Sequence, residues 1–234
     1  MTSSVPKEWL EPCKLENGWR FVCSTSLRNL VATDLAASFF RQLVNLIENE
    51  YHLENFHLKI HHNRKQHNRM EVSIFCGDDH TKQQMEPVVI CMSCEPTHEL
   101  SRTTLISEQR HTFAWLDCRN RSKLIVTPRR HVERLSQLND DNGEMKAFWA
   151  DTVQLIDDFN YPNLVINHGS LRKHGHLHLK IDLSKDIWET KIVRQHQQQL
   201  NHLAELLKQT DQIRSCFTDT HLQKEIEKGV IGMN

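Results

Sequence analysis

The stretch LRKHGHLHLK, residues 171–180, places a histidine at every second position: His174, His176 and His178. Side chains on a β-strand point to opposite faces in turn, so we expect the three imidazoles to share one face, with neighbours roughly 6–7 Å apart. The alternate residues, starting with Leu177, take the other face and are expected in the core. This pattern predicts a metal site or a histidine-based catalyst. A surface strand with incidental histidines is the alternative, because the chain holds 16 of them.

The composition is that of an ordinary globular protein. The chain has 234 residues, enough for one large or two small domains, with 38% hydrophobic and 25% charged residues. Its net charge of −1 argues against a broad nucleic-acid surface. No run of 18 apolar residues and no apolar signal-peptide core occur, which predicts a soluble cytoplasmic or nuclear protein without a membrane partner. Seven cysteines at irregular spacings indicate reduced thiols.

Hydrophobic periodicity predicts an alternation of helices and strands. A helix is expected over 35–51, strands over 55–60 and 69–76, and a polar linker over 77–87. The pattern then restarts. It predicts strands over 103–107, 111–117 and 122–127, a helix over 144–159, a strand pair over 163–167 and 174–183, and a long helix capped by Ser184.

One part of the chain echoes another. Residues 43–75 and 152–183 both read as a helix, an alternating strand, a short polar loop and a second alternating strand. His67 falls where His174 falls, and Arg69 and Glu71 replace the two later histidines. A degenerate duplication and a chance agreement both remain open, because this order of elements is common.

The motif HGHLHLK, in its context, resembles that of the histidine triad (HIT) family. Upstream lie a Cys-x-x-Cys start, a buried strand running into the Pro-x-x-His of PRRH, and the strand LVINHGS, and the similarity covers about residues 88–183. The resemblance implies an α+β fold, an antiparallel sheet with packed helices, in a family whose members usually dimerise to join two sheets. A fused duplicate would supply the second half within one chain, as in the related galactose-phosphate uridylyltransferases. We therefore expect an N-terminal, possibly degenerate HIT-like half over 1–86, a HIT domain over 87–183 and a helical extension over 184–234. The chain would be a monomer with an internal pseudo-dimer, or a homodimer.

The same resemblance implies the chemistry. The family transfers or hydrolyses nucleotides at an α-phosphate, with the middle histidine, His176, as the nucleophile that forms a covalent phosphoramidate. His178 would bind phosphate oxygens, and Asn167 the ribose or phosphate of a nucleotide or nucleotide-conjugate substrate. The glycine-rich phosphate loop of the family shrinks here to GSLRK, in which the expected substrate contacts are Gly169, Ser170 and Lys173, with Arg172 as a further candidate donor. Two further departures leave the substrate's identity open: Lys123 replaces a frequent histidine, and Lys180 to Asp182 replace a frequent glycine pair.

Cys91 and Cys94 have the spacing that lets two thiolates reach one tetrahedral zinc ion. The resemblance adds His131, from the Pro-x-x-His element, and His174, the first histidine of the triad. One structural zinc ion per chain is therefore expected, with His98 as a rival ligand. Other histidines are expected to be surface or hydrogen-bonded residues: His61, His62, His111 and His168.

Two other functions compete with a nucleotide hydrolase or transferase. One is a nucleotide-binding or scaffolding protein with vestigial catalysis, which the shortened phosphate loop favours. The other is an enzyme acting on adenylated nucleic-acid ends, which the near-zero net charge disfavours. Nucleic acid is thus an unexpected partner.

Overall fold

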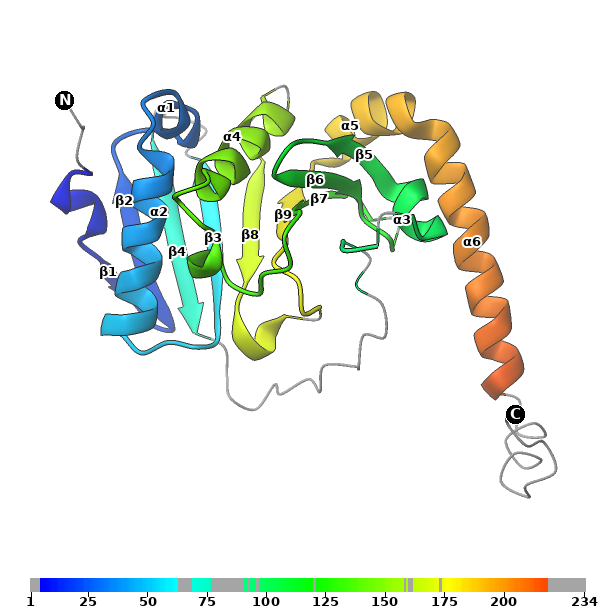
Figure 1. Ribbon diagram of the computed structural model, residues 1–234, viewed down its shortest axis with the longest axis horizontal. Coiled ribbons are helices and arrows are strands. Elements are labelled where there is room, and N and C mark those ends of the chain that lie inside the picture. The colour runs from blue at the N-terminus through cyan, green and yellow to red at the C-terminus, as the bar shows by residue number, and fades with distance from the viewer. Residues whose placement is uncertain are drawn as a thin grey trace, which may run out of the picture.

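The residues that the structure describes form a nine-stranded antiparallel sheet with helices packed on it (Figure 1). The computed structural model describes residues 5–62, 69–76, 91, 93–95, 97–119, 121–157, 159, 162–172 and 174–218, with side chains described to residue 209. The strands are β1 (Cys13–Leu15), β2 (Gly18–Cys23), β3 (Phe56–His62), β4 (Met70–Cys76), β5 (Leu105–Glu108), β6 (Thr112–Leu116), β7 (Lys123–Pro128), β8 (Asn163–Asn167) and β9 (Leu179–Asp182). Their order in the sheet is β1-β2-β4-β3-β8-β9-β7-β6-β5.

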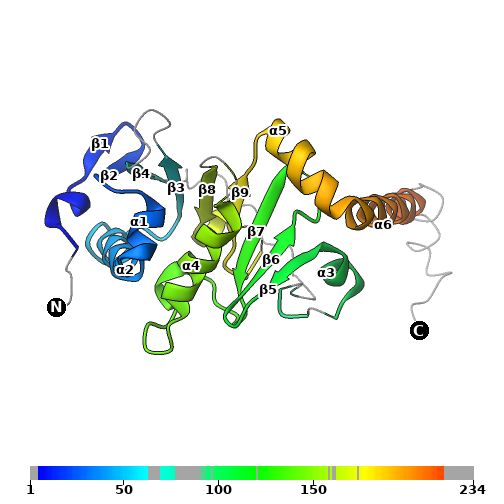
Figure 2. The same cartoon turned by 90° about the horizontal axis from the view of Figure 1, so that it is seen from above.

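The helices divide between one face of the sheet and its far end. They are α1 (Leu27–Ala32), α2 (Ala36–Asn45), α3 (Glu99–Thr104), α4 (Glu144–Ile156), α5 (Lys185–Ile187) and α6 (Arg194–Thr218). Short helical turns are η1 (Lys7–Leu10), η2 (Leu46–Glu50), η4 (Leu135–Gln137), η5 (Gly169–Leu171) and η6 (Trp188–Val193). Figure 2 shows α1, α2 and α4 together on one side of the sheet.

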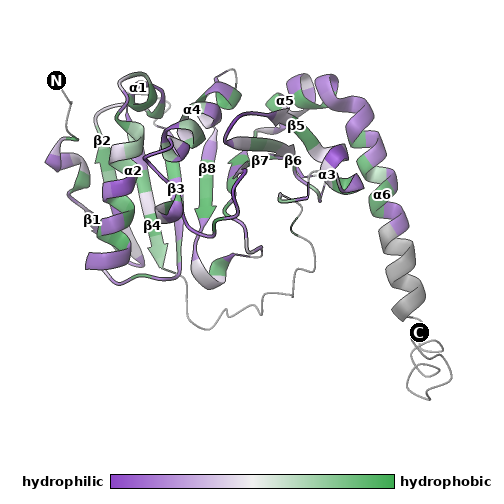
Figure 3. Ribbon diagram, in the orientation of Figure 1, coloured by the Kyte–Doolittle hydropathy of each residue, from purple (hydrophilic) through white to green (hydrophobic). Residues whose placement is uncertain are grey.

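The core lies between these helices and the sheet. The rings of Phe40 on α2 and Trp149 on α4 stack with centroids 3.7 Å apart, and neither side chain is exposed. The apolar residues of the inner strands, such as Leu58 and Ile166, point to the same layer, and Figure 3 shows hydrophobic colour along β4 and β8. Burial of large apolar side chains is a major source of stability. Since α2 comes from the N-terminal part of the chain and α4 from the part that follows it, this layer joins the two parts.

The two parts of the chain meet where β3 pairs with β8, from His57↔Asn167 to Ile60↔Leu164. The hairpins on either side of this junction repeat one another. Leu58 pairs with Ile74 as Leu164 pairs with Ile181, and Ile60 pairs with Val72 as Ile166 pairs with Leu179. In this register Glu71 corresponds to His178, as the similarity between residues 43–75 and 152–183 predicts. His67 lies outside the described residues. The expected α+β fold, an antiparallel sheet with packed helices, is confirmed.

Several predicted elements differ in extent. The predicted strand over 174–183 is wrong in its first half, because β9 begins only at Leu179. The backbone N–H of Leu177 instead donates to the carbonyl of Val132 at 2.6 Å, which draws the chain out of the sheet. Residues 99–104 form α3, so the strand predicted from 103 begins at Leu105. The hairpin β1–β2 was not predicted, and the predicted linker over 77–87 lies outside the described residues.

The C-terminal region begins as expected, with the hydroxyl of Ser184 accepting from the N–H of Ile187 at 3.3 Å. Helix α6 then runs past the sheet and away from it (Figure 1). It is tied down near its start, where the side-chain amide of Gln199 donates to the carbonyls of Thr103 and Leu105. Among the helices that the structure describes, none is both long and apolar enough to cross a membrane.

Candidate active site and metal centre

Four possible metal ligands gather beyond the end of β7: Cys91, Cys94, His131 and His176. The Nδ1 atom of His176 lies 3.3 Å from Sγ of Cys91 and 3.5 Å from Sγ of Cys94. The Nδ1 atom of His131 lies 3.2 Å from Sγ of Cys94. All four donor atoms lie within 4.8 Å of one another. The tertiary structure thus brings together three segments that are far apart in the sequence.

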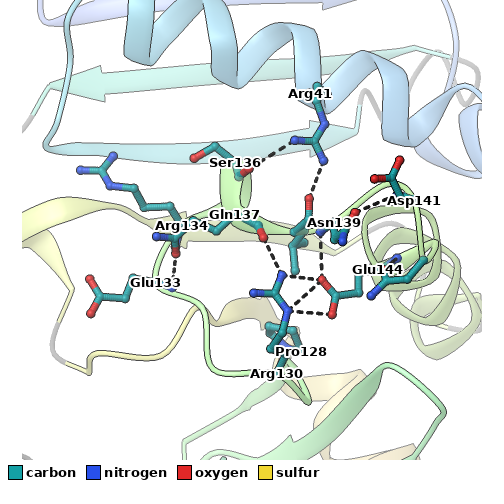
Figure 4. A network of polar contacts seen from close by, with 12 residues as sticks. Arg41, Pro128, Arg130, Glu133, Arg134, Ser136, Gln137, Asn139, Asp141 and Glu144 are labelled. Atoms are coloured by element: carbon teal, nitrogen blue, oxygen red, sulfur yellow. Dashed lines mark hydrogen bonds and ion pairs between the residues drawn. The ribbon is translucent and has the colours of Figure 1, made fainter.

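The chain around these ligands is held by its own hydrogen bonds. The Nε2–H group of His176 donates to the carbonyl of Pro128, the last residue of β7, at 2.8 Å. The guanidinium of Arg130, next to His131, binds the carboxylate of Glu144 at the start of α4 (Figure 4). Both segments that carry a histidine ligand are therefore held by hydrogen bonds to elements of the fold. Such hydrogen bonds commonly orient the ligands of a metal.

The four residues fit a tetrahedral metal site. Zinc bonds of about 2.3 Å to sulfur and 2.0–2.1 Å to nitrogen place a sulfur and a nitrogen ligand roughly 3.5 Å apart, close to the separations seen here. Because Nε2 of His176 carries the proton that is donated to Pro128, Nδ1 keeps its lone pair for a metal. Burial, together with the adjacent Cys91 thiol, raises the pKa of Cys94 to about 11. A bound cation would stabilise the thiolate form of Cys94 and so lower this pKa. This cluster could therefore bind a metal.

The cluster differs from the predicted ligand set in one residue. His174 is exposed and lies outside it, with its ring centroid 5.8 Å from that of His178. His98, the rival ligand, instead caps α3, where its ring accepts from the N–H of Leu100. The reason is that residues 174–176 form a bend rather than a strand, so the three histidines do not share one face.

The same geometry alters the predicted role of His176. One of its ring nitrogens faces the two cysteines and the other donates to Pro128. Within the described part of the chain, neither nitrogen is available to attack a substrate. The prediction that His176 is the nucleophile therefore disagrees with its surroundings.

His178 has the complementary arrangement. Its Nδ1–H group donates to the carbonyl of His176 at 3.0 Å. This bond places the lone pair on Nε2, which makes no hydrogen bond to any residue that the structure describes. Burial lowers the pKa of His178 to about 4, so the imidazole is neutral at pH 7 and its Nε2 can act as a nucleophile.

Asn167 lies beside His178. The ladder between β8 and β9 ends at the pair Ile166↔Leu179, and the next residues along the two chains are Asn167 and His178. Asn167, the last residue of β8, therefore points to the face opposite the core, and His178 directly precedes the neighbouring strand β9. The Oδ1 atom of Asn167 accepts from Nδ1 of His57 at 2.9 Å, and its Nδ2 group donates to the carbonyl of Leu171 at 3.2 Å.

The shortened phosphate loop follows Asn167. Gly169 has φ of 61°, and a Cβ there would come within 2.1 Å of Oδ1 of Asn55, so only glycine fits. The backbone N–H of Ser170 already donates to that same oxygen. Arg172 is buried and binds Glu133 and nearby carbonyls, so it holds the loop rather than offering a free donor. Lys173 lies outside the described residues.

His168 does not match the expectation of a surface or hydrogen-bonded residue. It is fully buried, stacks on Phe56 with centroids 4.2 Å apart, and neither ring nitrogen makes a hydrogen bond to the residues that the structure describes. Burial lowers its pKa to about 3, so it is neutral at physiological pH.

His57 and Asn55, both in the N-terminal half, were not predicted as part of the site. The only available signal was the alternation of residues 55–60, which puts His57 on the polar face of a strand. Which strand lies beside β3 cannot be read from that pattern.

Comparison with known proteins supports the fold. No protein-family model matches the sequence, and no curated protein matches it either. The structure resembles that of a uridylyltransferase mutant, with 12% sequence identity and a TM-score of 0.53 over 71% of this chain and 65% of that one. It also resembles uridylyltransferase, with 13% identity and a TM-score of 0.52 over 74% and 67% of the two chains. A third similar structure is a GalT-like protein from Arabidopsis thaliana, with 15% identity and a TM-score of 0.52 over 74% and 70%.

The chain therefore shares the fold of these uridylyltransferases and spans about two thirds of their length. The resemblance seen in the sequence and the similarity seen in the structure point to the same kind of α+β fold. At such low identity the fold is what the comparison establishes.

Proposed function

We propose that the protein is a HIT-type nucleotide hydrolase or nucleotidyltransferase that cleaves at the α-phosphate of a nucleotide conjugate, with His178 as the nucleophile. The observation that carries the proposal is the hydrogen bond from Nδ1–H of His178 to the carbonyl of His176, which leaves Nε2 neutral and without a hydrogen bond to any residue that the structure describes. A phosphorus electrophile is the substrate class that fits, because the fold is shared with proteins described as uridylyltransferases.

The reaction would proceed in two displacements. The lone pair on Nε2 of His178 attacks the α-phosphorus, a new N–P bond forms, and the P–O or P–N bond to the leaving group breaks with its electrons on the leaving group. The imidazole then carries a positive charge, which the carbonyl of His176 stabilises through Nδ1–H. Water or another hydroxyl acceptor next attacks phosphorus, the N–P bond breaks, and the proton of the acceptor is released. Neutral His178 is regenerated.

The Cys₂His₂ cluster would hold a structural zinc ion in this proposal. Four protein ligands leave no vacant position, which is typical of structural rather than catalytic zinc. Its ligands Cys91 and Cys94 would be tied to His131 and His176. Since the carbonyl of His176 is the partner of Nδ1–H of His178, this site would fix the orientation of the nucleophile.

A nucleotide-binding or scaffolding protein is the second candidate. The observation that favours it is the short phosphate loop, in which Arg172 is bound to Glu133 and the N–H of Ser170 to Asn55. In that case the protein would bind nucleotides without turning them over.

The test is to trap the covalent intermediate. The protein is mixed with nucleoside phosphoramidates, dinucleoside polyphosphates and nucleotide sugars, quenched in alkali, and digested for mass spectrometry. We expect a nucleoside monophosphoryl group on the peptide that carries His178, and nucleoside monophosphate in solution. His178→Asn should abolish both.

The matched control is His174→Asn, which changes a neighbouring exposed histidine and should retain both signals. A label on His176, or turnover by His178→Asn, would contradict the assignment of the nucleophile. Binding without turnover of any substrate in the wild type would favour the scaffolding protein.

A further inference from the structure

The side chain of Asn167 is held in one orientation. It is 9% exposed, and it makes two hydrogen bonds within the protein. Nδ2 donates to the carbonyl of Leu171, and Oδ1 lies 2.9 Å from Nδ1 of His57. Since an amide oxygen can only accept, His57 must be the donor, as its Nδ1–H tautomer. Among the described residues nothing uses the second amide N–H or the second lone pair of Asn167, so we assign both to the ligand.

The residue that sets this orientation belongs to the N-terminal half. His57 lies on β3, opposite Asn167 in the ladder with β8. Asn55, two residues earlier, accepts from the N–H of Ser170 at 2.7 Å in the loop that follows. The N-terminal half therefore contacts the predicted substrate site at two adjacent points, through side chains rather than through core packing.

The same two strands carry a second histidine–asparagine pair away from the site. Nδ1 of His61 lies 3.3 Å from Oδ1 of Asn163, at the other end of the β3–β8 junction. There the neighbour on β9 is Asp182. The two pairs share their chemistry and their strands, and only the pair at Asn167 lies beside His178.

We propose that His57 is a positioning residue that orients Asn167 for its contact with the nucleotide, so that the N-terminal half completes the substrate site within one chain. The inference rests on the proposed function, because it assigns Asn167 a nucleotide contact. It gives the degenerate half a role beyond covering the core. Replacing His57 leaves Oδ1 of Asn167 without its partner, and an unsatisfied or reoriented amide binds a ligand less well.

The experiment compares His57→Phe with His61→Phe. Phenylalanine keeps a planar ring but removes the donor in both pairs. Titration calorimetry with AMP, GMP and UMP should show affinity about tenfold lower for His57→Phe, for whichever nucleotide the wild type binds. His61→Phe should stay within twofold. His57→Gln, which keeps an N–H donor, should recover most of the affinity. Equal losses in the two phenylalanine variants, or none in His57→Phe, would overturn the proposal.

A second measurement works on the free protein and does not depend on activity. The side-chain amide signal of Asn167 in a ¹⁵N NMR spectrum is assigned by its loss in Asn167→Asp. It should shift in His57→Phe and stay in place in His61→Phe, and His57 in the wild type should show the Nδ1–H tautomer. The Nε2–H tautomer would overturn the proposal even if no variant folds. If these signals behave as expected but no nucleotide binds the wild type, the proposed function fails while the hydrogen bond stands, and the positioning role fails with it.

Discussion

The carboxylate of Glu144 provides a quantitative test of how the segment carrying His131 is held. Its side chain is 8% exposed, and its two oxygens accept from the guanidinium of Arg130 at 2.9 and 2.6 Å and from the N–H of Asn139 at 2.9 Å (Figure 4). Glu144→Gln keeps the shape of the side chain. It removes the charge and turns one acceptor into a donor that faces the guanidinium.

The expected loss of stability follows from these contacts. The hydrogen bonds to Arg130 lower the pKa of Glu144 to about 2, from an ordinary 4.5, a shift that corresponds to roughly 3 kcal/mol of stabilisation at about 1.36 kcal/mol per pKa unit. Solvent screens part of it, because the Arg130 side chain is 48% exposed. We therefore expect Glu144→Gln to lower the free energy of unfolding by about 2 kcal/mol at pH 7.

The effect must depend on pH in a defined direction. The pKa of Glu144 is lower in the folded protein than in the unfolded chain, so the stabilisation is present above about pH 4.5 and is lost as the pH falls towards 2. The difference between wild type and Glu144→Gln should shrink over that range.

The difference in the free energy of unfolding between wild type and Glu144→Gln is measured by urea unfolding, followed by circular dichroism at several pH values. The control is Glu108→Gln, whose partner Arg129 lies at the same 2.6 Å but in an exposed pair, and which should change stability by less than about 0.5 kcal/mol. Equal effects of the two substitutions, or a difference for Glu144→Gln that is unchanged at pH 3, would refute the reasoning.

Three further predictions concern the metal, the core and a buried histidine. His176→Ala should lose the metal that the wild type binds, whereas His174→Ala should retain it, as measured by elemental analysis; the reverse result would restore the ligand set predicted from the sequence. Phe40→Ala should lower the free energy of unfolding by about 3–5 kcal/mol, because the ring stacks on Trp149, and a loss below 1 kcal/mol in denaturation would argue against that packing. The pKa of His168 is lowered to about 3, so its contribution to stability should fall as the pH drops below about 6.5. His168→Phe should flatten that dependence between pH 6.5 and 5, and an unchanged pH profile would contradict the buried, neutral state.

The alternation and composition of the chain were sufficient to predict most of the elements near the site. Helix α4 and strands β4, β7 and β8 lie close to where hydrophobic periodicity places them, because burial of one face imposes a period on the sequence. Helix α2 ends earlier than predicted, at Asn45, and continues as the turn η2. The hairpin β1–β2 escaped prediction, and so did the helical form of residues 99–104, whose polar and β-branched residues carry no clear period.

The residues gathered at the site were predicted in part, and our proposal gives His176 and His178 roles that differ from those expected from the sequence. Cys91, Cys94 and His131 were recognised from their spacing and from the resemblance to the HIT family, and the structure brings them together. The fourth position was given to His174 because the resemblance to the HIT family places the first histidine of the triad there. The N–H of Leu177 donates to the carbonyl of Val132, and the chain bends before β9 begins. His176 thereby lies at the cysteines, and Nε2 of His178 makes no hydrogen bond within the described part of the chain.

By itself the sequence determined the class of fold, the chemical types gathered at the site and the repeated helix–strand–strand pattern, because these depend on local periodicity and on the spacing of reactive side chains. Only the tertiary structure decided which histidine faces the thiols and which residue orients Asn167. Both depend on contacts between segments far apart in the chain: Pro128 with His176, and His57 with Asn167. A one-residue change of register reverses the face to which a strand side chain points, so such contacts are settled only when the strands are paired.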